Sequence, residues 1–366
     1  MTFGISVIFL MSCSVKASDQ QPAEDNAAVY YRKAAQIWKK PSNSARDEAF
    51  NIVKYGWHPG QGNAEDYLFE NKQCLEETMR GAGVKDCDFS FGGKTRSDFD
   101  FKLFELNKLL WLNARYHLRQ KEVDEAAEIC LASFSLARHI AQGKGVLFKI
   151  ISPVLEIGAS EVLKTCMQSP LLTGEEKNKI RRYLQEYWHS HYTLSDFIQE
   201  NRDEFLFTVE KLTSPGNLAA AIQLSSPDEN PLLGRRLYIL NKGYLADADF
   251  SQMVSRGEKI FARNYYDPLI EAARRVEVGN NVEQLTQVKA LERKLRPKTE
   301  NNFVLFVKFG WFKLQGREKA KEYLADILVQ QMLFPGISGS DILPRTIDKY
   351  AALLKERIKL EKALTH

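Results

Sequence analysis

Residues 101–140 read FKLFELNKLLWLNARYHLRQKEVDEAAEICLASFSLARHI, and this stretch decides the fold. Apolar side chains recur at about every third or fourth position on both sides of the polar segment 119–122, the spacing of two amphipathic helices. The apolar positions are Phe101, Phe104, Leu109, Trp111, Leu112 and Tyr116 in the first half, then Val123, Ala126, Ala127, Cys130, Phe134, Ala137 and Ile140. The stretch therefore predicts a hairpin of two helices.

The turn of this hairpin, residues 119–126 (RQKEVDEA), resembles the turn of a tetratricopeptide repeat. In that repeat, small residues on the two helices allow close backbone approach, and Ala114 and Ala126 stand at a suitable separation. Lys121 replaces the usual turn Gly, and Cys130 and Ser133 stand where a bulky residue and an Ala are usual. The resemblance implies a tetratricopeptide-like array or solenoid of helical hairpins, although no sustained 34-residue period is found.

The rest of the chain continues the helical pattern, so the sequence predicts an all-α fold with no substantial sheet. Thr173 and Glu176 form a capping box that opens a helix. Three prolines make residues 214–234 the best candidate for a hinge or loop. We therefore expect a helical domain over 26–213 and a helical continuation over 235–366. Further helices are expected at 26–39, 64–79, 145–169, 175–192, 195–212, 249–275, 282–295, 303–333 and 345–363.

The first seventeen residues form a short apolar run followed by small residues, which is typical of an export signal and too short for a membrane span. Leu10 and Cys13 resemble the bacterial lipoprotein box, with residues 1–12 as the signal and Cys13 as the lipid acceptor. Cleavage after Ala17 to release a soluble protein is the alternative. Residues 18–25 are polar and serve as a tether. The sequence thus predicts an exported protein of the cell envelope. It would be held at the membrane by an N-terminal lipid and face the periplasm or the cell surface.

Charge and cysteine content restrict the partners. The net charge of +4 is mild for 366 residues, and the basic pairs are scattered, which argues against nucleic-acid binding. In an oxidising compartment Cys74 and Cys87 are a possible disulfide, because the glycines near residue 82 let the chain turn back. Cys130 and Cys166 lie in apolar helical patterns and are expected as small buried side chains. No spacing suggests a metal site or a cofactor.

Motifs that could carry catalysis fail on their spacing. The segment 92–95 (GGKT) ends like a phosphate-binding loop, but Asp88 occupies the position of the first glycine. Glu156 and Glu161 lie on the most apolar internal helix and are the best carboxylates for a functional role, although an exposed edge is the more ordinary expectation. No catalytic residue is nominated. The aromatic residues Tyr187, Trp188 and Tyr192 are the possible ligand-binding site, unless they belong to a core.

Several segments together resemble uncharacterised exported helical proteins of planctomycetes and related bacteria. The resemblance rests on residues 26–31 (NAAVYY), 87–89 (CDF), 109–118 (LLWLNARYHL), 135–141 (SLARHIA), 150–163 and 343–344 (LP). It implies tetratricopeptide-like architecture and an envelope location, and it transfers no catalytic residue. We expect a non-catalytic scaffold that binds another envelope protein or peptide. The alternatives are an exported protein that binds carbohydrate or another small ligand and, with less support, a hydrolase.

Overall fold

The computed structural model describes residues 25–89, 96–143, 146–189, 193–212, 248–279, 282–297, 308, 311–312, 314–327, 329 and 342–365. The export signal, the tether up to residue 24 and the predicted hinge lie outside the described residues. Within this part of the chain there are thirteen helices and no strand, which confirms the all-α prediction. The helices are α1 (Ala27–Ile37), α2 (Asn43–Tyr55), α3 (Gly62–Glu70), α4 (Lys72–Gly83), α5 (Arg96–Gln120), α6 (Val123–Gln142), α7 (Val146–Met167), α8 (Gly174–His189), α9 (Leu194–Leu212), α12 (Ala248–Gly279), α13 (Val282–Leu295), α15 (Arg317–Ile327) and α17 (Ile342–Thr365).

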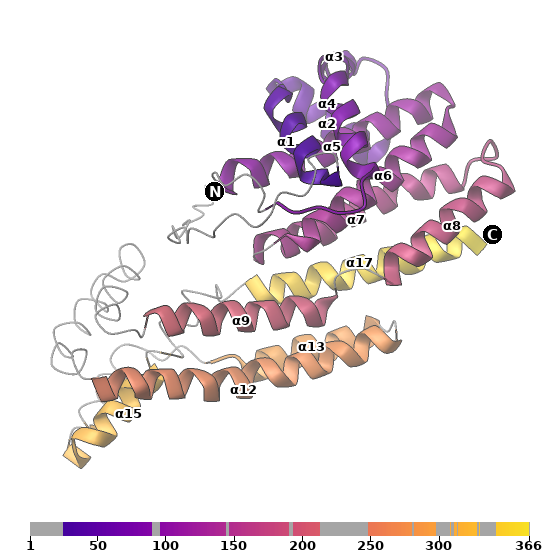
Figure 1. Ribbon diagram of the computed structural model, residues 1–366. Helices are drawn as coiled ribbons and strands as arrows, with labels where there is room; N and C mark the ends of the chain where they lie inside the picture. Colours follow the sequence, from indigo (N-terminus) through magenta and orange to yellow (C-terminus); the bar gives the residue numbers. More distant parts are fainter. Residues whose placement is uncertain are drawn as a thin grey trace.

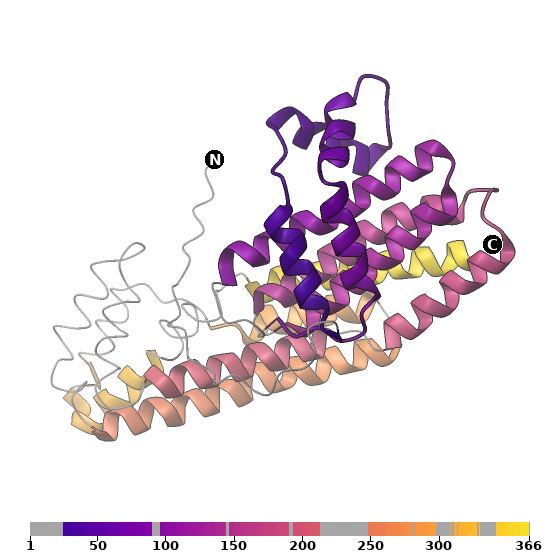
Figure 2. The ribbon, with the colours of Figure 1, turned by 45° about the horizontal axis from the view of Figure 1, so that its top comes forward.

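The helices are arranged in successive layers (Figure 1). Helices α1–α4 pack on the long helices α5, α6 and α7. Below these lie α9 and α17, followed by α12 and α13, with α15 near one end of α12. Figure 2 shows the same order after rotation, with α9 and α12 side by side along their length. We call α1–α8 the N-terminal lobe, and α9, α12, α13 and α15 the C-terminal layer.

Each of these two parts has its own hydrophobic core. One core contains side chains from Ala27 to Tyr187, and the other begins at Leu194. The division between the cores therefore falls between α8 and α9, ahead of the predicted hinge at 214–234. Helix α17 belongs to both, because its first half packs in the second core and Leu360 and Leu364 pack in the first.

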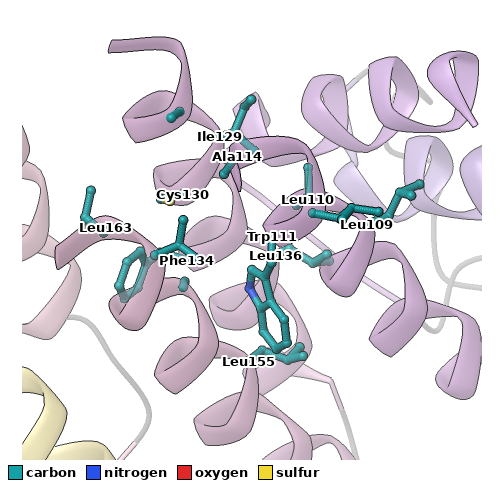
Figure 3. Packing of buried hydrophobic residues seen from close by; sticks show 14 of the residues in the cluster. Leu109, Leu110, Trp111, Ala114, Ile129, Cys130, Phe134, Leu136, Leu155 and Leu163 are labelled. Atoms are coloured by element: carbon teal, nitrogen blue, oxygen red, sulfur yellow. The ribbon is translucent and has the colours of Figure 1, made fainter. Parts of the chain in front are cut away.

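The predicted hairpin is formed by α5 and α6. Ala114 and Ala126 are fully buried, as close helix packing requires (Figure 3). Trp111 reaches across from α5, where its indole N–H donates to Ser133 Oγ of α6 at 2.9 Å. The same ring lies on Gly158 of α7, where an added Cβ would stand 2.3 Å from a ring carbon. Gly158 therefore makes room for this tryptophan, and Ser133 accepts its N–H.

Backbone hydrogen bonds around Lys121 close the turn between α5 and α6. Lys121, at the position of the usual glycine, has a left-handed backbone with φ of 68°. Its N–H donates to Leu118 O, and the N–H of Glu122 donates to His117 O, which is the pattern of a Schellman cap. The predicted capping box is also confirmed, because the N–H of Glu176 donates to Thr173 Oγ1.

The long-range contacts differ from those of a linear array. In a solenoid each repeat contacts only its neighbours in sequence. Here α17 returns to pack along α7, and the side chains of Glu156 and Arg357 meet across 201 positions of sequence. The described helices therefore do not form a simple linear array, since the C-terminal helix packs against the middle of the chain. Among the described residues, no helix has the length and hydropathy that crossing a bilayer requires.

Candidate functional site

The aromatic residues predicted as a ligand site belong largely to the interior. Tyr187 is buried, and its hydroxyl donates to Glu156 Oε2 at 3.1 Å. Trp188 is partly buried against the first core, and Tyr192 lies outside the described residues. The prediction is therefore wrong for Tyr187, because its side chain packs in the first core and its hydroxyl bonds to α7.

Glu156 is the centre of a buried polar cluster between α7, α8 and α17. Its carboxylate has no exposure and accepts two bonds from Arg357, from Nε at 2.5 Å and from Nη2 at 3.0 Å. Burial opposes the charge on Arg357, but Glu156 outweighs it and raises the pKa of the guanidinium. Burial, followed by the charge of Glu156, raises the pKa of Tyr187. The expected exposed edge is thus wrong for Glu156, because a partner from the far end of the chain covers this carboxylate, whereas Glu161 is exposed as expected.

Other charges on α7 are also paired with the helices that cover it. Lys149 bonds to Glu200 of α9 at 3.3 Å, and Lys164 bonds to Glu356 of α17 at 2.5 Å. With Glu156, these residues stand seven and eight positions apart, which places all three on one face of the helix. This spacing is the signal in the sequence that could have identified the face. We call Glu156, Arg357 and Tyr187 with these two ion pairs the joint; it fastens the N-terminal lobe to the remainder of the molecule.

The predicted disulfide is not present, because Cys74 and Cys87 are both free thiols. The Cys74 thiol donates to Ala34 O at 3.4 Å, whereas Cys87 faces Ala28 near the start of the same helix. Six residues of α1 separate these two contacts, about 9 Å along a helix axis. A disulfide requires Cα atoms within about 7 Å. The glycines of α4 do not fold the chain back, since the helix runs on through Gly81 to Gly83.

A second polar contact lies deep in the N-terminal lobe. His139 is fully buried, with Nδ1 2.8 Å from the Tyr31 hydroxyl and Nε2 3.3 Å from Lys85 O. Burial, reinforced by the nearby charge of Arg138, lowers the pKa of His139 to about 4. The imidazole is therefore neutral at physiological pH and ties α6 to α1 and to the segment after α4.

The candidate site is instead an aromatic cluster at the surface of the N-terminal lobe. It consists of Trp57, which follows α2, Phe69 of α3 and Tyr116 of α5. The Tyr116 ring centroid lies 6.1 Å from that of Trp57 and 5.8 Å from that of Phe69, both in edge-on geometry. Arg119 lies over the Trp57 ring at 5.1 Å and is fixed there by Glu65 at 2.9 Å.

This aromatic cluster includes an exposed ring and has further exposed rings on the neighbouring helix. Phe69 is 55% exposed, and Phe50 and Tyr55 of α2 are exposed as well. Lys54 lies over the Tyr55 ring at 4.7 Å, and no salt bridge holds it in the described part of the chain. Exposed aromatic rings and a cation suit the binding of a partner side chain.

The sequence contained a signal for this surface. Trp57 stands in the segment 55–60 (YGWHPG), between residues that break helices, where connecting segments run over the protein surface. An aromatic side chain in such a loop is less readily absorbed into a core than one on a helix. The position of Trp57 between Gly56 and Pro59 is therefore a better signal for a surface site than the high density of aromatic residues around Tyr187.

Comparisons with protein-family models, curated proteins and solved structures find no match to this chain. The resemblance to exported planctomycete proteins therefore stays a prediction. Among the described residues, no group of three or more His, Cys, Asp or Glu side chains is arranged to hold a metal ion.

Proposed function

We propose that this protein is an exported, envelope-associated helical scaffold that binds a partner protein through the aromatic cluster of Trp57, Phe69 and Tyr116. The observation that carries the proposal is the edge-on contact of the Tyr116 ring with Trp57 and with Phe69, whose own ring is exposed. Tryptophan, tyrosine and arginine are the residues that dominate protein interfaces, and here Arg119 accompanies the rings.

The partner segment has an apolar anchor and a carboxylate. The anchor packs on Phe69 and Tyr116, and the carboxylate faces Lys54, whose position over Tyr55 leaves its ammonium without a carboxylate in the described residues. Arg119 serves the cluster differently, because its bond to Glu65 holds it flat on Trp57.

Site-directed photo-crosslinking in envelope preparations tests the proposal. A photoreactive residue placed at position 70, beside Phe69, captures one defined protein, which is identified and then bound in purified form. We expect Phe69→Ser to weaken that purified complex by roughly tenfold, the effect of losing about 1.4 kcal/mol of interface contact. Leu171→Ser is the matched control, because Leu171 is similarly exposed, at 57%, but lies between α7 and α8.

Three outcomes would overturn the scaffold proposal. One is equal binding by both variants, another is binding of an oligosaccharide in place of a protein, and the last is turnover of a substrate by the purified chain. Oligosaccharide binding that is lost in Phe69→Ser would instead favour a carbohydrate-binding protein, since sugar faces also stack on aromatic rings.

The location in the envelope rests on residues 1–17 and has its own test. A mature chain that begins at acylated Cys13 would be held at the membrane surface, because two or more acyl chains give stable anchoring. We expect the intact mass of the membrane fraction to correspond to this lipidated form. A chain that begins at unmodified Ser18 would remove the lipid anchor and leave the binding proposal intact.

A further inference from the structure

We propose that residues 308–322, at the end of the C-terminal layer where α15 lies, dock on the surface of a membrane that contains anionic lipids. The segment reads KFGWFKLQGREKAKE and combines large apolar side chains with basic ones. Trp311 and Leu314 enter the headgroup region of the bilayer, and the basic side chains face its phosphate groups. This contact is separate from an N-terminal lipid, since it uses side chains of the folded protein.

Two apolar side chains of this segment are open to the surroundings. Among the described residues, Leu314 is the most exposed large apolar side chain, at 84%, and Trp311 is 62% exposed. Both have helical backbone, and they stand three positions apart, which is the spacing of neighbours on a helix surface. Phe312 instead packs on α15, where its ring centroid lies 4.5 Å from that of Tyr323. The segment is thus fixed to α15 while it exposes Trp311 and Leu314.

The same segment carries most of the excess positive charge of the protein. It holds five of the 51 basic residues and two of the 47 acidic residues, a net charge of +3 within the +4 of the whole chain. Lys308, Arg317 and Lys319 are exposed. One of the two carboxylates, that of Glu318, pairs with Lys321 at 3.2 Å. The exposed apolar pair is therefore bordered in sequence by cations, which attract anionic headgroups.

A bilayer suits this surface better than a protein partner does. A specific protein interface buries about 800 Å² on each partner, which is far more than two exposed side chains supply. A bilayer accepts a small insertion, and tryptophan is enriched at the depth of its headgroups. Helices that lie on membrane surfaces combine the same two elements, namely apolar side chains such as Trp and Leu and a border of Lys and Arg.

The position of the segment gives the docked protein an orientation. In Figure 1, α15 lies at the lower left, whereas α2 and α3 lie at the top, at the opposite end of the molecule. The rotated view of Figure 2 also separates these two ends. The aromatic cluster of Trp57, Phe69 and Tyr116 belongs to the end that contains α2 and α3, so docking through α15 leaves it uncovered.

Binding to vesicles of defined composition tests this inference. The chain that begins at Ser18 is used, because it keeps every described residue but lacks the apolar signal and Cys13, which could bind membranes by themselves. We expect it to co-sediment with vesicles of phosphatidylcholine and phosphatidylglycerol in equal parts. Binding to phosphatidylcholine alone should be at least about fivefold weaker, since each Lys or Arg near an anionic surface contributes about that factor. Added salt should weaken binding to the mixed vesicles, because it screens the attraction.

Variants separate the apolar contribution from the charge. Trp311→Ser should weaken binding to the mixed vesicles by about tenfold or more, because a large apolar side chain no longer leaves water. Lys319→Gln should weaken it by about fivefold on the mixed vesicles and leave binding to phosphatidylcholine alone unchanged. Leu171→Ser is the matched control, because Leu171 is 57% exposed but lies between α7 and α8, and its variant should bind as the wild type does.

Tryptophan fluorescence shows whether Trp311 itself enters the bilayer. The other four tryptophans, Trp38, Trp57, Trp111 and Trp188, belong to the N-terminal lobe. Brominated phosphatidylcholine in the mixed vesicles should therefore quench only part of the emission of the wild type. That part should be absent from Trp311→Phe, which keeps an aromatic ring for binding.

Three results with vesicles would overturn the inference: no binding to the mixed vesicles, equal binding by Trp311→Ser and the wild type, or quenching that persists in Trp311→Phe. Capture of one defined protein by a photoreactive residue at position 315 in envelope preparations would also overturn it, because the surface would then be a protein interface. Each of these results leaves the partner proposal untouched, since crosslinking from position 70 is measured independently. Vesicle binding that is lost in Trp311→Ser, without any capture from position 70, would support this inference and contradict the partner proposal.

Discussion

The N-terminal lobe and the C-terminal layer bury different kinds of polar side chain. In the N-terminal lobe the interior contacts are mainly neutral: Trp111 donates to Ser133, which donates to Asn107, and His139 meets Tyr31. Apart from Glu156 in the joint, the buried carboxylate among the described residues of the lobe is Glu77, which pairs with Lys33 and Arg80 at its rim.

In the C-terminal layer the interior contacts are mainly ionised. Glu292 is fully buried, accepts from Tyr265 at 2.8 Å and pairs with Arg296. Glu277 accepts from the backbone and hydroxyl of Ser195, which fixes the start of α9 to α12. Neutral bonds specify geometry at little electrostatic cost, whereas buried charges depend on the presence of every partner. The difference predicts that the two regions respond differently when a charge is added or removed.

The largest effect is expected at the joint, where the two regions meet. Arg357→Met removes the guanidinium that neutralises Glu156 and leaves a carboxylate with no solvent contact. Breaking a buried pair in this way costs about 3–5 kcal/mol. Urea unfolding should show this loss of stability, together with earlier unfolding of the C-terminal layer.

The double variant Glu156→Met with Arg357→Met separates charge from packing. It should recover most of the lost stability, because two apolar side chains of similar length replace the pair. Lys359→Met is the surface control, since Lys359 is 61% exposed and pairs only with Glu356, and it should change stability by less than about 1 kcal/mol. Equal losses in the single and double variants would mean that the joint acts through shape and not through charge.

A smaller effect, opposite in sign between the two regions, is expected from pH. Glu258 of α12 is 2% exposed, and one of its oxygens has no hydrogen-bond partner. Burial raises the pKa of Glu258 to about 7; Glu210 of α9 raises it further, and Lys259 lowers it. Asp326 of α15 lies near Gly257, the residue that precedes Glu258 in α12. The folded protein therefore retains a proton on Glu258 that the unfolded chain releases at lower pH.

The sign follows from the raised pKa. Between about pH 4.5 and 7 the unfolded state ionises first, so the layer loses stability as pH rises, by on the order of 2 kcal/mol. Glu258→Gln should match the wild type at pH 4.5 and exceed it by about this amount at pH 8. Glu70→Gln, at an exposed position of α3, should show no such pH-dependent difference. Unfolding measurements at the two pH values decide this.

The N-terminal lobe should respond in the opposite direction. Since the pKa of His139 is lowered to about 4, the unfolded chain binds a proton below about pH 6.5 that the folded lobe excludes. Acidification from pH 6.5 to 4 therefore destabilises the lobe. Hydrogen exchange, corrected for its intrinsic pH dependence, should show weaker protection of α6 at low pH and of α12 at high pH. The same direction in both helices would contradict the contrast between the regions.

How much could be predicted from the sequence depended on the distance between interacting residues. Local signals succeeded: the Thr173 capping box and the α5–α6 hairpin need residues that are close in sequence, and α13 occupies the predicted range 282–295. The partner of Glu156 could not be predicted, because Arg357 is 201 positions away and its helix has many similar charges.

The smallest effect is expected at Lys121, in the turn between α5 and α6 of the N-terminal lobe. Lys121 adopts a left-handed backbone, which costs an L residue about 1–2 kcal/mol and costs glycine nothing. Glycine also adds freedom to the unfolded chain, which offsets part of this gain. Lys121→Gly should therefore raise the free energy of unfolding by up to about 1 kcal/mol, while Lys121→Ala, which keeps a Cβ, should not. Chemical denaturation of the three chains distinguishes these outcomes. A gain of the same size for alanine would show that removal of the lysine side chain, and not relief of the turn, is responsible, because only glycine changes the cost of the left-handed backbone.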